Sequence, residues 1–94
     1  MKLTINVTKQ DILNGKPGNL NSCPIARAAK RMGFKKVSVF GKLTGNYKGE
    51  NLTLDMPIRA RNFIDKFDAT IGDVATRKTI KPFKFTLRWS GGKG

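Results

Sequence analysis

A capped amphipathic helix is the segment that most constrains how this chain of 94 residues can fold. Ser22 is a favourable N-cap residue, Pro24 suits the first helical turn, and Gly33 can adopt the left-handed conformation that ends a helix. The apolar side chains at the spacing i, i+3, i+4, i+7 are Ile25, Ala28, Ala29 and Met32. This narrow face predicts a helix at about residues 23–32, with small alanines that allow close packing on a sheet.

Strands are expected where apolar and polar residues alternate along the chain. The segments with this pattern are 2–7, 36–40, 52–54 and 83–88. A hairpin tip is expected at 47–51, immediately before the third of these segments. The chain therefore has strand signals on both sides of the main helix.

A short helix is expected directly after the first strand. Thr8 can cap residues 9–14, and Asp11 stands at the position of the reciprocal partner in a capping box. Gly15 ends this segment.

A second long helix is expected after Asp55, which can cap it, with Pro57 in the first turn. Its apolar positions again follow the spacing i, i+3, i+4, i+7 and are Ala60, Phe63, Ile64 and Phe67. The connection at 68–77 has no clear period, and we expect Ile71 and Val74 to pack beneath it.

The order strand, helix, strand, strand, helix, strand predicts one α+β domain over residues 1–89. The expected architecture is the split β-α-β, or ferredoxin-like, arrangement: a four-stranded antiparallel sheet with two helices on one face. Residues 90–94 are expected to form a flexible tail. The second face of the sheet would stay partly open, but this architecture has many functions and so does not decide among them.

The loop that leads into the main helix is the most concentrated candidate site. Gly15 and Gly18 let the backbone approach a ligand, Lys16 adds a charge, and a helix N-terminus favours anions. The expected ligand carries a phosphate, and its predicted contacts are Lys16, Gly18, Asn21, Ser22, Cys23 and Arg27. Neither phosphate-loop signature is present, so an ordinary capped helix with a tight entry loop is the alternative.

The charge of the chain is strongly positive, since 19 Lys and Arg face 6 Asp and Glu, a formal +13. Such a balance predicts attraction to nucleic acid, nucleotides or an acidic protein surface, with a merely solvated basic surface as the alternative. Outside the loop, the expected basic patch comprises Lys30, Arg31, Lys35, Lys36, Arg77, Lys78, Lys81, Lys84 and Arg88. Trp89 lies beside the second group, where it can either stack on a base or cover the sheet edge.

Catalytic and metal chemistry are not indicated. The chain has no histidine and one cysteine, which removes the commonest general base, the commonest zinc ligand and any internal disulfide. Cys23, at a helix N-terminus near Lys16, is expected to have a lowered thiol pKa, although simple packing is the alternative. Asp65 and Asp68 share a helix but lack a third ligand. We therefore expect a non-enzymatic protein without metal or cofactor.

Two pairs of segments resemble short proteins of bacteriophages and prophages, most of them without an assigned function. The first pair is Gly-Lys-Pro-Gly at 15–18 with Cys-Pro-Ile-Ala-Arg-Ala at 23–28. The second is Phe-Ile-Asp-Lys-Phe-Asp-Ala at 63–69 with Pro-Phe-Lys-Phe-Thr-Leu at 82–87. Family members often carry a further cysteine ahead of the Cys-Pro pair, where this chain has Leu20.

The resemblance implies a phage accessory protein that neutralises a host defence. It would bind a phosphate-bearing ligand, either to sequester a nucleotide immune signal or to block a nucleic-acid-guided defence complex, and a second subunit could complete its pocket. A DNA- or RNA-binding regulatory protein is the alternative. No apolar run has the length of a membrane span, and the N-terminal residues do not form a secretory signal. The expected location is the cytoplasm of the infected bacterium, and no membrane partner is expected.

Overall fold

The computed structural model describes residues 2–89, and the expected tail at 90–94 lies outside them. The elements are β1 (Lys2–Val7), α1 (Lys9–Asn14), α2 (Pro24–Arg31), β2 (Phe34–Phe40), β3 (Lys42–Tyr47), β4 (Glu50–Asp55), α3 (Ile58–Asp68), α4 (Val74–Arg77) and β5 (Phe83–Arg88). No helix among the described residues is long and apolar enough to cross a membrane.

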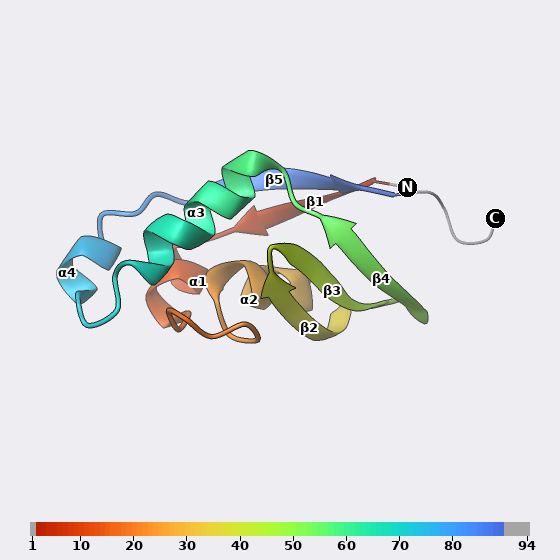
Figure 1. Cartoon of the computed structure of the whole chain (residues 1–94), viewed down its shortest axis with the longest axis horizontal. Coiled ribbons are helices and arrows are strands. Elements are labelled where there is room, and N and C mark those ends of the chain that lie inside the picture. Colours follow the sequence, from red (N-terminus) through yellow and green to blue (C-terminus); the bar gives the residue numbers. More distant parts are fainter. Residues whose placement is uncertain (1, 90–94) are drawn as a thin grey trace.

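The strands form two antiparallel sheets, so the expected single sheet of four strands is wrong, although the small α+β class is right. β1 pairs with β5, with Ile5 opposite Phe85. β2, β3 and β4 form a separate meander. Figure 1 shows β1 and β5 side by side, with α3 along them and the meander below.

The strand that the sequence pattern did not indicate, β3, explains this difference. Gly41, with a φ of 72°, turns the chain directly from β2 into β3. Lys48 and Gly49, with φ values of 53° and 87°, form the two-residue hairpin turn into β4. The predicted hairpin tip is therefore confirmed. Because both edges of β3 are paired through short local connections, the meander forms without recruiting β1.

A β-bulge in β2 brings its neighbour β3 close to the core. β2 places Lys36 and Val37 opposite a single residue of β3, Gly45. A Cβ atom at Gly45 would lie 3.2 Å from a ring carbon of Phe34. A side chain at this position would require its neighbours to shift slightly, which favours glycine. The same glycine interrupts the alternation that would have predicted β3.

Helix α2 lies between the two sheets, in contact with both β1 and β2. Its buried residues are Pro24, Ile25, Ala26, Ala28 and Ala29, so the predicted close packing of a small apolar face is confirmed. Met32 is instead the C-cap and is 37% exposed. The N-cap is Cys23 rather than Ser22, because the Ser22 carbonyl accepts from the Lys16 N–H within the loop and the helix begins one residue later.

Helix α3 packs on the two-stranded sheet, where the ring centroids of Phe63 and Phe83 lie 4.6 Å apart. The predicted apolar face is confirmed for Ala60, Phe63 and Phe67, which are buried. Asp55 does not cap the helix. It ends β4 and pairs with Lys42, while Pro57 holds the N-cap position without a side-chain hydrogen bond.

The connection between α3 and β5 does not bury Ile71 and Val74, contrary to expectation. Ile71 is 67% exposed and Val74 53%. The contacts with the core come instead from the buried Ile80 side chain and from Arg77. The Arg77 guanidinium lies 5.4 Å from the centre of the Phe67 ring and donates to the side chain and main chain of Thr70.

Candidate functional site

The loop before α2 is closed by contacts with its neighbours. The Gly18 N–H donates to the Asp68 carboxylate over 2.9 Å, and the Asn21 side chain donates to the Val37 carbonyl over 2.8 Å. The Lys16 N–H donates to the Ser22 carbonyl. The Gly18 N–H, which a bound phosphate would need as a donor, is thus already hydrogen-bonded to the Asp68 carboxylate.

The N-terminus of α2 is buried as well. The Cys23 sulfur accepts from the Ala26 N–H over 3.4 Å, and the residue is 3% exposed. Burial raises the pKa of the Cys23 thiol, and nearby Asp68 raises it further, so the expected lowered pKa is wrong. The Arg27 Nε atom lies 3.7 Å from the Asp11 carboxylate. A phosphate role for this loop remains a prediction.

Several residues of the expected basic patch make intramolecular contacts. Arg31 donates twice to Asp11, and the ammonium of Lys30 donates to the Asn21 carbonyl. The exposed cations of the patch are Lys35 and Lys36 on β2, Lys78 and Lys81 after α4, and Lys84 and Arg88 on β5. One continuous basic patch stays a prediction.

Trp89 lies against the end of the meander. Its ring is half-buried and meets the Tyr47 ring edge to face, with centroids 6.1 Å apart. This contact supports the covering role for Trp89 rather than a stacking role.

The outer face of the meander carries a groove that sequence reasoning missed. Side chains alternate between the faces of a sheet, so each row of residues opposite the core projects from the same face. Ser38, Thr44 and Thr53 form one row across the three strands, and Phe40, Lys42 and Asp55 form the next. Together with Met56 and Arg61, these residues line a cavity of about 780 Å³.

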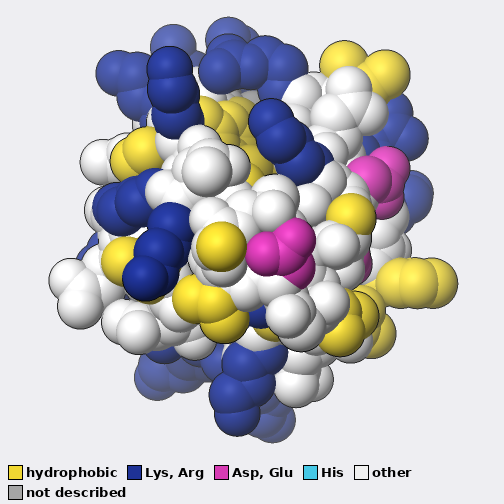
Figure 2. Space-filling view, turned by 90° about the vertical axis from the view of Figure 1, so that its left-hand side faces the viewer, with side chains coloured by type: hydrophobic (Ala, Val, Ile, Leu, Met, Phe, Trp, Pro, Cys, Tyr) yellow, Lys and Arg dark blue, Asp and Glu magenta, His cyan; other side chains and the backbone are white. Residues whose placement is uncertain are grey.

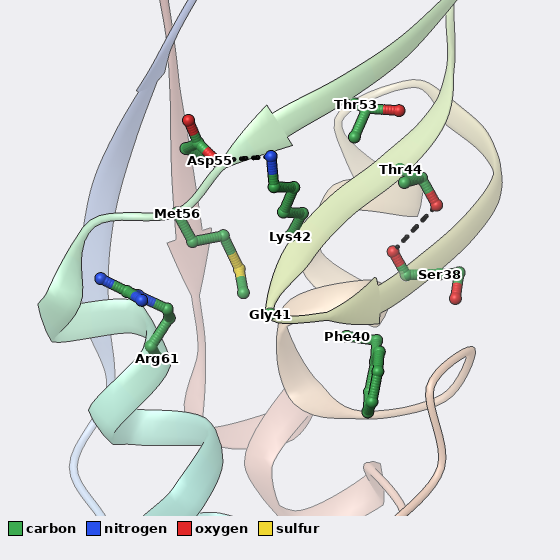
Figure 3. Close-up of a pocket in the computed structure, with 9 residues that line it drawn as sticks. All are labelled: Ser38, Phe40, Gly41, Lys42, Thr44, Thr53, Asp55, Met56 and Arg61. Carbon is green, nitrogen blue, oxygen red and sulfur yellow. Dashed lines mark hydrogen bonds and ion pairs between the residues drawn. The ribbon is translucent and has the colours of Figure 1, made fainter.

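The groove combines an exposed aromatic ring with two cations. Phe40 is 80% exposed at the end of β2. Figure 3 shows the Met56 side chain between Lys42 of β3 and Arg61 of α3. Lys42 lies 3.2 Å from the Asp55 carboxylate, whereas Arg61 has no ion-pair partner within residues 2–89.

Part of this site had a sequence signal. Val37 and Val39 alternate with Ser38 in the second predicted strand, so they share one face and Phe40 falls on the other. An aromatic residue on the outer face of a strand is a candidate binding residue. Lys42 has no such signal because β3 is not indicated by the sequence pattern, and Arg61 is only one of several basic residues of its helix.

Comparisons with protein-family models, with curated protein sequences and with solved structures find no match for this chain. Within the described residues, no three His, Cys, Asp or Glu side chains lie close enough to hold a metal ion. The fold and the groove alone describe this chain: it is a small, basic α+β protein with a polar groove, lined in part by cations, on the outer face of a β-meander.

Proposed function

We propose that this protein binds single-stranded nucleic acid without catalysis, with the groove on the meander as the platform for an unpaired base. The observation that carries the proposal is the position of Phe40, which is 80% exposed in a groove that Lys42 and Arg61 also line. Aromatic rings combined with cations are the usual means of holding an unpaired strand.

The aromatic ring favours a single strand over a duplex. A base can stack on Phe40 only when it has left its own stack, and extruding a base from a duplex costs a few kcal/mol. The hydroxyl groups of Ser38, Thr44 and Thr53 lie in the same groove. Hydroxyl groups both donate and accept hydrogen bonds, so this row suits the polar edges of any base.

The cations of the groove suit the phosphates. Arg61 has no competing ion pair among the described residues, and the Lys42–Asp55 pair is exposed, with 58% and 85% of the two side chains accessible. An exposed pair of this kind contributes little and exchanges readily for a phosphate. The formal charge of +13 would speed the encounter with any polyanion.

The groove is a better candidate for this role than the loop before α2, where Asp68 already accepts from Gly18. The resemblance to phage proteins supplies a setting that we include in the proposal: the bound strand would belong to a nucleic-acid-guided host defence complex. A nucleotide immune signal has the same base and phosphate chemistry and is the second candidate ligand.

Fluorescence anisotropy tests the proposal with labelled single strands of about 12 nucleotides and with the matching duplex, at about 0.3 M salt so that non-specific attraction is screened. We expect the single strand to bind more tightly and Phe40→Ala to weaken it at least fivefold, in line with about 1–3 kcal/mol per stacked base. Arg61→Gln should also weaken binding.

The matched controls change similar residues elsewhere. Ile71→Ala removes another exposed apolar side chain, and Arg88→Gln removes a cation from the other sheet. Both variants should bind like the wild type. Equal affinity for duplex and single strand, or a Phe40→Ala variant with wild-type affinity, would overturn the proposal.

A further inference from the structure

A second groove lies on the opposite side of α3, between this helix and the segment that leads into β5. Its volume is about 380 Å³, and the lining residues that matter here are Arg59, Asn62, Lys66, Thr79, Lys81 and Phe83. In Figure 1, α3 and the segment between α4 and β5 run alongside each other. The groove therefore joins parts of the chain that are distant in sequence.

The charged residues that line the groove, within the part of the chain that the structure describes, are all cationic. Arg59, Lys66 and Lys81 contribute three positive charges, and no acidic residue lines it. None of the three cations forms an ion pair with a carboxylate among the described residues. Arg59 lies over the Phe83 ring, 6.0 Å from its centre, so its guanidinium is held at the groove by an aromatic contact rather than by an anion.

The wall that carries Lys81 is anchored to the rest of the molecule. The ammonium of Lys9 in α1 donates to the carbonyl of Lys78 and, over 3.0 Å, to the carbonyl of Ile80. The Ile80 side chain is 3% exposed and belongs to the core. Lys81 thus follows a residue that is fixed both by its backbone and by its side chain.

The surface around this region concentrates positive charge. Figure 2 looks onto the end of the molecule that carries α4, and shows Lys and Arg side chains crowded along its upper edge with apolar atoms recessed between them. α3 and β5 lie on this upper side in Figure 1. Cations at the edge of a recessed apolar surface attract an anion more strongly than cations in open water, because the surface partly shields the pair from water.

We propose that this second groove binds a phosphate group, held by Arg59, Lys66 and Lys81 together with the amide of Asn62. The phosphate can be part of a nucleic-acid backbone or of a free nucleotide. Asn62 also borders a smaller cavity that shares Met56 and Arg61 with the first groove. A strand whose base stacks on Phe40 could therefore cross α3 and place a phosphate here. That path rests on the proposed function, whereas phosphate binding itself does not.

A nitrogen–proton NMR titration tests the inference, with inorganic phosphate, adenosine monophosphate and a single-stranded oligonucleotide as separate probes. Inorganic phosphate should give saturable shifts confined to the amides around Arg59, Lys66 and Lys81. The double variant Lys66→Gln/Lys81→Gln should weaken phosphate binding at least fivefold while the remaining spectrum shows a folded protein.

The matched control is Lys35→Gln/Lys36→Gln, which removes the same charge from exposed positions on β2. It should leave the phosphate affinity unchanged. Three results would show that phosphate binding depends only on net charge and would overturn the inference. They are shifts that do not saturate, shifts spread over every basic surface, and an equal loss of affinity in the control variant.

The probes also separate this inference from the proposed function. If the phosphate belongs to a nucleic-acid backbone, the oligonucleotide should shift residues of both grooves. If it belongs to a free nucleotide, adenosine monophosphate should bind more tightly than the oligonucleotide. Phe40→Ala should not alter the titration with inorganic phosphate. If strand binding fails while phosphate still saturates the second groove, the proposed function is wrong and the phosphate site stands.

Discussion

Arg31 and Asp11 form a two-pronged ion pair, with both hydrogen bonds 2.8 Å long, in which the carboxylate is 1% exposed and the guanidinium side chain 48%. The same carboxylate accepts from the Thr8 N–H, and the same guanidinium donates to the main-chain oxygen of Asn6. One ion pair therefore connects β1, α1 and α2.

Replacing Asp11 by alanine should destabilise the protein by about 3 kcal/mol, because it leaves the Thr8 N–H without its side-chain acceptor and the Arg31 guanidinium without its carboxylate partner in a partly buried site. Urea unfolding at neutral pH measures the change. Asp55→Ala is the control, since its pair with Lys42 is exposed and should contribute less than about 1 kcal/mol. Equal losses in the two variants would contradict a special role for Asp11.

The stability should also depend on pH through Asp11. Burial alone would raise the pKa of this carboxyl, but hydrogen bonds from Arg31 and Thr8 outweigh burial and hold the pKa below its usual value. A group with a lowered native pKa contributes fully above its unfolded pKa of about 4, and this contribution is lost as the pH falls through the native pKa.

The measurement is the free energy of unfolding at about pH 6 and about pH 3, in the wild type and in Asp11→Asn. The wild type should lose more stability than the variant between these values. Other carboxyls, including Asp73, whose pKa is lowered by hydrogen bonds from Thr76, contribute equally to both proteins and cancel in the comparison. Parallel pH profiles would contradict the prediction.

The aromatic residues of the core and of the groove should differ sharply in their effect on stability. Phe63 and Phe85 are 8% and 5% exposed, and replacing either by alanine should cost about 3–5 kcal/mol. Phe40→Ala should change the free energy of unfolding by less than about 0.5 kcal/mol, because its ring is mostly in water. Thermal unfolding compares the three variants, and a large loss for Phe40→Ala would mean that its ring is a packing residue.

The bulge in β2 predicts a stabilising substitution. Lys36 has a φ of 55°, in the left-handed region that favours glycine. Lys36→Gly should therefore stabilise the protein by about 0.5–1 kcal/mol, after the higher entropy of glycine in the unfolded chain is counted. Lys35→Gly removes the same charge at an ordinary strand position and should destabilise by about the same amount. A midpoint of urea unfolding that falls in both variants would contradict the assignment of strain to Lys36.

Local features of the fold were predictable because their causes lie within a few residues. The capping box of Thr8 and Asp11, the turn at Gly49 and the alanine face of α2 all follow from short-range chemistry, and all are present. Cys23 took the cap position because the loop before it uses the Ser22 carbonyl, which no local rule anticipates.

The long-range features were not predictable from the pattern alone. Nothing near Arg31 indicates Asp11 as its partner, and nothing in the periodicity indicates that Gly45 belongs to a strand. Missing that strand gave the wrong number of sheets. It also concealed the groove, since Lys42 lies on β3 and Arg61 reaches the same cavity from α3 only through the tertiary fold.

The pairing of β1 with β5 has a consequence for how a newly made chain folds. Thr4 and Thr86, 82 positions apart, face each other across this sheet, with their hydroxyl oxygens 3.3 Å apart. Among the described elements β5 is synthesised last, so β1 must wait for its partner until all the elements between them have been made. The meander needs only residues 34–55 and has short turns, and elements with local contacts form fastest. The growing chain can therefore form the meander, with Phe40 and Lys42 on its outer face, before it can close its core.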